Sequence, residues 1–401
     1  MVRLRIRGIV HLPWNRQPEL FDDRFYKAVA NAIAEIVGVE PSKEVTDEIL
    51  SGALDVVLAK FTAQVQFHVR RYQRKNIRRF GRADKSFERR LRGHWGSALD
   101  QYKIISAGLR ELGSEFNGFQ RPAAVESQDF VFEALTGLHA RACRTAEEVY
   151  HLLSGGFPKG ALARCRTLHE LAVTSGIICA YGHDSNYADL AERYLLHDHI
   201  LNWKDALDYQ EHCREIGYEP FSEAEMQEFE ATRNAVIERL GRSFGMENGW
   251  ATELAARLAI EGDPRPTFKN LEAIANLSHL RSYYKLASHE VHSDAKGWRL
   301  NVGQRGDVTY LSAGRMNFGL ADPGQLALHS LQLCTTHLLF CAGSPRPADL
   351  VCVKAIQGLV DRVDEDFAAA EQSVYAAEEK IQSELKSKGK RQTTARILFS
   401  W

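Results

Sequence analysis

The chain has 401 residues, which is long enough for two or three structural units with buried cores. Hydrophobic residues make up 44% and charged residues 26%, and this ordinary balance excludes collagen-like, mucin-like and wholly disordered proteins. Lysine and arginine number 51 and aspartate and glutamate 52, so the formal net charge is -1. Averaged over the chain, this charge predicts no strong attraction to nucleic acid or to an acidic membrane.

The sequence contains no recognisable pattern for a disulfide framework, a metal site or a membrane-spanning segment. The seven cysteines are widely spaced and include no CxxC pair. His197 and His199 flank Asp198 without a third ligand at metal-site spacing, so we expect no metal and no cofactor. The start MVRLRIRGIVHLPW lacks a signal-peptide core, and the apolar stretch at 331–343 is too short and polar to span a bilayer. We therefore expect a cytoplasmic protein that makes no membrane contact.

Most of the chain has the three- and four-residue apolar spacing of amphipathic helices. The helices expected on this basis occupy residues 24–37, 46–70, 86–112, 128–154, 159–181, 186–216, 222–244, 250–260, 267–292, 323–342 and 347–386. Residues 2–7 alternate like a strand, and residues 298–302 and 308–312 read as two strands of a hairpin. The predicted fold is mainly α, a helical bundle with a small β-hairpin at 298–312.

Helix boundaries are indicated by caps and by clusters of Gly, Pro and Ser. Ser222 with Glu225 three residues later is typical of a capping box. Clusters at 113–127, 262–266 and 343–347 predict linkers. We therefore expect three regions, which are an N-terminal helical region at 1–126, a central helical domain at 127–345, and a C-terminal helix with a basic tail at 346–401.

The charge is most uneven between residues 70 and 92, which read RRYQRKNIRRFGRADKSFERRLR. Eleven basic residues stand against two acidic ones, so this segment carries +9 and the remainder of the chain -10. Arginines recur every three or four residues with aromatic side chains between them, a pattern that suits phosphate contacts and base stacking. The residues expected to bind RNA or DNA are Arg70, Arg71, Arg74, Lys75, Arg78, Arg79, Arg82, Arg89 and Arg90.

The same segment also suits pairing with an acidic surface of this chain or of a partner. Asp361, Asp364, Glu365 and Asp366 form one such acidic group. No helix-turn-helix, zinc-finger or RNA-binding signature accompanies the basic segment, so no sequence-specific readout is predicted. Both alternatives remain open at the level of the sequence.

A polar stripe runs along the otherwise apolar helix expected at 159–181. Arg166, His169 and Glu170 lie on one face of it. Charged side chains are seldom buried without a partner, so Arg166 and Glu170 are expected to pair with each other or with a facing helix.

The helix expected at 267–292 offers such partners. Its stripe ends in Tyr284, Ser288 and His292, which would meet the first stripe if the two helices pack together. Such a cluster marks either a functional site or a network that fixes packing. The candidate catalytic residues are Arg166, His169, Glu170, Tyr284, Ser288 and His292.

Several stretches resemble a bacterial family of all-helical proteins of unknown function, over roughly residues 87–345. They include GLHARACRTAEEVYHLLSGGFPKGALARCRTLHELAVTSGII and, later, YYKLASHEVHSDAKGW. The most specific element is the pentad RTLHE at 166–170, together with Ser288 and His292. The resemblance implies a helical bacterial protein in which the charged ends of the pentad and His292 matter, and it implies no reaction.

The polar pairs are also loosely similar to those of helical ribonucleases of toxin and anti-phage systems, in which four to six residues separate an Arg from a following His. The chain has five Arg–His pairs at this spacing, where composition alone gives roughly four, so the spacing singles out no site. Two of these pairs, Arg144 with His151 and Arg164 with His169, lie within the resembling stretches. In a metal-independent ribonuclease the histidine would move a proton and the arginine would stabilise the phosphorane charge.

Two functions follow. The first is a nucleic-acid-associated bacterial effector, with metal-independent RNA cleavage in a stress or anti-phage module as its activity and Arg166, Glu170 and His292 as its site. The second is a non-catalytic scaffold or sensor in which the polar cluster is structural. The amphipathic segment 347–386 further predicts a homodimer or a docked partner helix.

Overall fold

The structure is a computed structural model that describes residues 18–38, 46–299, 302–305, 308–341 and 346–387. The fold is mainly α, as predicted. The chain forms two compact units that divide after Arg90, and each is described by itself. The three regions expected from the sequence stay a prediction.

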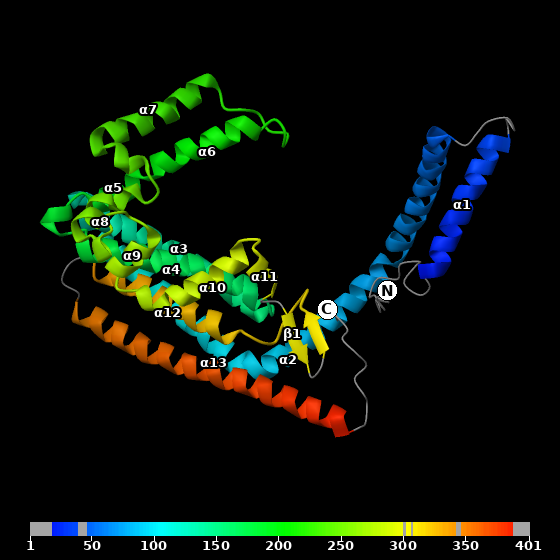
Figure 1. Cartoon of the computed structure of the whole chain (residues 1–401). Coiled ribbons are helices and arrows are strands. Elements are labelled where there is room, and N and C mark those ends of the chain that lie inside the picture. Colours follow the sequence, from blue (N-terminus) through cyan, green and yellow to red (C-terminus); the bar gives the residue numbers. More distant parts are fainter. Residues whose placement is uncertain (1–17, 39–45, 300–301, 306–307, 342–345, 388–401) are drawn as a thin grey trace. The chain divides into compact units, whose positions relative to one another are not determined.

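The first unit contains α1 (Pro18–Gly38) and the N-terminal part of α2 (Asp47–Ser127), drawn in blue in Figure 1. The rings of Phe25 and Phe61 meet edge to face with their centroids 5.5 Å apart. Val29 and Val57 are buried, whereas most of the side chains described in this unit are exposed. The strand predicted at 2–7 lies outside the described residues.

Helix α2 is one continuous helix, and the linker predicted at 113–127 is wrong. Gly113 suggests a break because glycine disfavours helix interiors. In the structure Gly113 instead allows a close approach, since a Cβ at this position would lie 2.1 Å from Cε1 of His139. Pro122 is tolerated within the last two turns of the helix. Packing therefore overrides the local preference of this segment.

The core of the second unit is formed by three helices that pack against one another, with a fourth and a fifth beside them (Figure 1). They are α3 (Phe130–Ser154), α4 (Pro158–Tyr181), α12 (Ala321–Leu339), α10 (Arg281–Val291) on α4, and α13 (Pro347–Ser387) on α12. The C-terminal part of α2 joins this core, because the Tyr102 hydroxyl donates to the carbonyl of Ala146 at 2.8 Å.

The C-terminal helix α13 buries part of its apolar face within its own unit. Val360, Val363 and Phe367 are buried, and the Phe367 ring lies 6.1 Å from that of Trp95. Contact with α12 and α2 thus accounts for much of the apolar stripe that the sequence displays. Association with a second copy or a partner helix through 347–386 stays a prediction.

The remaining helices of the second unit are shorter. They are α5 (Leu190–Leu196), α6 (Asp198–His212), α7 (Glu223–Leu240), α8 (Thr252–Leu258), α9 (Phe268–Ile274) and α11 (Ala295–Arg299), with short 3-10 helices η1 (Ser185–Tyr187), η2 (Arg242–Gly245), η3 (Gly249–Ala251), η4 (Ile260–Gly262) and η5 (Ser278–Leu280). The capping box at the start of α7 is confirmed, since Ser222 and Glu225 bond each other's backbone N–H groups. The single helix predicted at 267–292 is wrong, because Asn276 adopts a left-handed φ of 58° that separates α9 from α10.

Two short strands, β1 (Val302–Arg305) and β2 (Val308–Leu311), pair antiparallel, with Val302 opposite Leu311. The strand predicted at 298–302 begins too early, because residues 298 and 299 end α11. The carboxylate of Asp294 accepts the backbone N–H groups of Lys296 and Gly297, which starts that helix. Among the described helices, none is long and apolar enough to cross a membrane.

Candidate functional site

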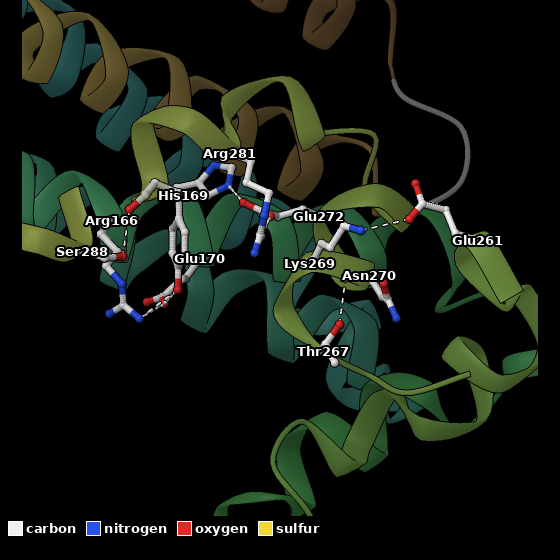
Figure 2. Close-up of polar contacts among 11 residues, drawn as sticks. Arg166, His169, Glu170, Glu261, Thr267, Lys269, Asn270, Glu272, Arg281 and Ser288 are labelled. Carbon is white, nitrogen blue, oxygen red and sulfur yellow. Dashed lines mark hydrogen bonds and ion pairs between the residues drawn. The ribbon is translucent and has the colours of Figure 1, made fainter. Parts of the chain in front are cut away.

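The two predicted polar stripes do lie side by side, because α10 packs on α4. Arg166 and Glu170 occupy one face of α4 at a four-residue spacing, with Nη2 3.1 Å from Oε1. Nη2 of Arg166 also donates to the Tyr284 hydroxyl at 2.8 Å, and that hydroxyl donates to Oε1 of Glu170 at 3.0 Å. We call Arg166, Glu170 and Tyr284 the Arg166 cluster (Figure 2 labels its two charged residues).

The electrostatics of the Arg166 cluster keep its phenol protonated. Burial raises the pKa of Tyr284, the negative charge of Glu170 raises it further, and Arg166 opposes both effects. The guanidinium carbon of Arg166 lies 5.0 Å from the centroid of the Tyr284 ring, within the range of a cation–π contact. Each charged member therefore has its counterpart inside the cluster.

A second cluster surrounds Glu272 of α9, which the sequence did not single out. The Glu272 side chain is 0% exposed. Its Oε1 lies 2.8 Å from Nε2 of His169, and its Oε2 accepts from Nη1 of Arg281 (Figure 2). A buried carboxylate is tolerated when cationic and hydrogen-bonding groups surround it in this way. We call Glu272, His169 and Arg281 the Glu272 cluster.

The two clusters meet at aromatic rings. The His169 ring lies 5.7 Å from that of Tyr284 and 5.9 Å from that of Phe268. A narrow cavity lined by Arg166, His169, Tyr284 and Cys165 adjoins them, with room for about one water molecule. Burial raises the pKa of the Cys165 thiol, whose Sγ donates to the carbonyl of Pro323, so this thiol is unreactive.

Two of the predicted candidates do not join these clusters. The Ser288 hydroxyl donates to the backbone carbonyl of Tyr284 at 2.9 Å, one turn earlier in its own helix. His292 follows the last residue of α10, and its side chain is exposed. The polar contacts of the described chain link neither side chain to Arg166 or Glu170. Catalytic roles for all six candidates stay a prediction.

The two Arg–His pairs differ in their surroundings. Nε of Arg164 lies 2.6 Å from Oε2 of Glu148, whereas His169 belongs to the Glu272 cluster, so this pair is divided between separate partners. Arg144 and His151 instead line one cleft beside α3. Both pairs fall within the spacing of four to six intervening residues, so the sequence does not distinguish them. Their surroundings in the fold do.

His197, considered above as a metal ligand, has a structural partner. Its Nε2 lies 3.0 Å from the carbonyl oxygen of Met246, and burial lowers its pKa. Within the described ranges, no group of three or more His, Cys, Asp or Glu side chains is placed to hold a metal ion.

The basic segment lies on α2, and its residues up to position 90 belong to the first unit. Every residue predicted to contact nucleic acid is exposed, as is Lys85. Aromatic side chains accompany them: Phe67 is 57% exposed and Phe80 37% exposed. The Arg71 guanidinium lies 5.9 Å from the Phe67 ring centroid. Arg92, at the end of the predicted segment, belongs to the second unit and pairs with Asp100 at 2.8 Å.

One of the acidic residues proposed as an alternative partner is already engaged in its own unit. Oδ2 of Asp364 on α13 lies 2.6 Å from Nε2 of His329 on α12. This hydrogen bond, with the charge of Asp364, raises the pKa of His329 against the opposing effect of burial. Asp364 therefore stabilises the contact between α12 and α13.

The DUF5677 family model matches residues 132–307 of this chain. It describes a family of unknown function. The predicted resemblance to such a family is confirmed, over a shorter stretch than residues 87–345. The DUF5677 segment contains both polar clusters, and the basic segment precedes it. None of the curated proteins and none of the solved structures matches the chain.

Proposed function

We propose that this protein binds nucleic acid through the basic face of α2 at residues 70–90, and that the helical body after it is a scaffold. The observation that carries the proposal is the exposure of ten lysine and arginine side chains on one unbroken helix. Two acidic residues lie in this stretch, so its net charge is +8.

The spacing of the charges suits a polyanion. Twenty-one helical residues extend about 30 Å, a length over which a nucleic-acid strand presents many phosphates. Six side chains follow one another at three- or four-residue steps and so share one stripe, and they are Arg71, Arg74, Arg78, Arg82, Lys85 and Arg89. Exposed aromatic rings beside such a stripe favour single strands, whose bases are free to stack.

The binding experiment compares two triple variants with the wild-type chain. The test variant replaces Arg74, Arg78 and Arg82 with glutamine. The control variant replaces three exposed basic residues of another long helix, α13, with glutamine, and they are Lys354, Arg362 and Lys380. Fluorescence anisotropy with a labelled single-stranded RNA and a duplex DNA should show affinity reduced more than about tenfold in the test variant only. Equal losses in the two variants, or no binding by the wild type, would contradict the proposal.

A scaffold role for the helical body is favoured by the two polar clusters. Glu272 is fully buried between His169 and Arg281, and Arg166 and Glu170 bond each other and a shared tyrosine. Groups paired in this way specify how helices pack. The cavity beside them has room for about one water molecule, which is too little for a phosphodiester.

RNA cleavage at Arg166, Glu170 and His292 is tested with three variants of the full chain, each with alanine at one of these positions. RNA cleavage and melting temperature are measured for each variant. The scaffold predicts lower melting temperatures for Arg166→Ala and Glu170→Ala, no change for His292→Ala, and unaltered RNA affinity. Loss of a wild-type cleavage activity in all three variants, with melting temperatures nearly unchanged, would establish a ribonuclease instead.

A further inference from the structure

The second unit contains a cleft that the proposed function does not use. It has a volume of about 590 Å³ and lies among α2, α3 and the end of α12. Ligand-binding clefts in proteins commonly measure about 300–1,000 Å³, so this one is large enough for a small organic molecule.

The floor of the cleft is electrically neutral at physiological pH. His139 and Cys143 of α3 line it, one turn apart. Burial lowers the pKa of His139 to about 4, and burial raises the pKa of Cys143 to about 11. The hydroxyl of Thr136 also faces the cleft, where its Oγ1 is buried without a hydrogen-bond partner in the described chain. The floor thus offers apolar surface and one unused hydroxyl.

The rim of the cleft carries two arginines on opposite helices, Arg110 on α2 and Arg144 on α3. Both are exposed, and neither forms an ion pair with a carboxylate in the described ranges. Glu147 and Glu148 also line the cleft, and each has another partner, because Glu147 lies 3.3 Å from His151 and Glu148 lies 2.6 Å from Arg164. The guanidinium donors of the rim therefore remain free.

We propose that this cleft binds a small organic anion. Arg110 and Arg144 hold its phosphate or carboxylate group, since a guanidinium presents paired donors that match both groups. The apolar body of the ligand lies on the neutral floor, with one polar group in reach of Thr136. This site is separate from the basic face of α2 at 70–90, so loss of either binding activity leaves the other in place.

Isothermal titration of the full chain with three probes tests the chemistry of the ligand. The probes 1-naphthyl phosphate, 1-naphthoate and 1-naphthol share one ring system and differ in charge. The anions should bind about tenfold more tightly than the alcohol, and the ratio between the two anions tells which acidic group the cleft prefers. Equal affinity for the alcohol, or no binding of either anion, would overturn the proposal.

Variants locate the binding. Arg110→Gln and Arg144→Gln should each weaken the tighter anion about tenfold, and Ala140→Leu, which narrows the cleft without changing charge, should weaken all probes that bind. The matched control is Arg141→Gln, an exposed arginine of the same helix that does not line the cleft. All four positions are exposed, and melting temperatures confirm that each variant folds. If Arg144→Gln behaves like Arg141→Gln, the site is refuted.

Discussion

Removing the carboxylate of Glu272 should unfold the helical body at a markedly lower temperature. Alanine at this position takes away the acceptor shared by His169 and Arg281. The His169 side chain is 7% exposed, so its ring nitrogen finds little water in exchange. The Arg281 side chain is 29% exposed and can turn toward solvent.

The expected loss of stability in Glu272→Ala follows from these exposed fractions. A buried donor left without its acceptor costs about 1–3 kcal/mol. The hydrogen bond lost by Arg281 adds about 1 kcal/mol, because solvent replaces much of it. A total of about 3 kcal/mol lowers the melting temperature of a unit of this size by about 6 °C, at roughly 2 °C per kcal/mol.

Differential scanning calorimetry measures this effect against a matched control in the same helix. Lys269 pairs with Glu261 at 2.9 Å, and the two side chains are 57% and 74% exposed (Figure 2). Lys269→Ala should therefore cost about 0–1 kcal/mol. Glu272→Gln, which keeps an acceptor, should fall between the two variants. A Glu272→Ala protein that melts no lower than Lys269→Ala would refute the structural role of the Glu272 cluster.

Three further outcomes are expected. The pKa of His329 is raised in the folded state by its hydrogen bond to Asp364. The stability that this hydrogen bond contributes is therefore present below about pH 6.5 and is lost as pH rises through the pKa of the folded state. Melting temperatures measured from about pH 6 to about pH 9 should fall more steeply in the wild type than in His329→Gln. The pKa of His139 is lowered to about 4 by burial, so the unfolded chain binds a proton between about pH 6.5 and about pH 4 that the folded chain does not. The free energy of unfolding measured in urea should therefore fall from about pH 6.5 to about pH 4, and it should fall less in His139→Gln. Gly113→Ala should destabilise the protein by about 1–3 kcal/mol, because the added Cβ clashes with the His139 ring. Gly118→Ala in the same helix, where nothing lies within 4 Å of an added Cβ, should stabilise the protein by up to about 1 kcal/mol. Denaturant midpoints that change alike in the two variants would contradict this difference.

The pairing of α4 with α10 was predictable from the sequence, because it follows from local spacing. Arg166 and Glu170 are one helical turn apart, and Tyr284 ends an apolar stripe that had to be buried. A charged pair in an apolar helix needs partners, and the stripe expected at 267–292 ends in polar side chains. Of the six candidates on the two stripes, Arg166, Glu170 and Tyr284 form one hydrogen-bonded cluster.

Glu272 escaped prediction because its environment is tertiary. It is a single acidic residue in a run that reads as continuous with α10, whereas in the structure a left-handed residue, Asn276, separates α9 from α10 and Glu272 contacts His169. The continuity of α2 was hidden for a similar reason. Gly113 and Pro122 favour a break locally, and contact with His139 of α3 is invisible in the sequence around them.

The near-zero net charge of the chain conceals the feature on which the proposed function depends. The stretch at 70–90 carries +8, and its basic side chains are exposed on α2. The acidic remainder includes Asp364, which is bonded within the second unit. A charge averaged over 401 residues is therefore a poor guide to the field around one helix.

The salt dependence of RNA binding tests the central claim most directly. Each phosphate contact contributes about -0.7 to the slope of the logarithm of the association constant against the logarithm of salt concentration for a single strand. Six contacts along the stripe predict a slope of about -4 in the wild type, and replacing Arg74, Arg78 and Arg82 with glutamine should reduce its magnitude by about 2. A slope near zero in the wild type, or one that the triple substitution leaves unchanged, would contradict nucleic-acid binding by this helix.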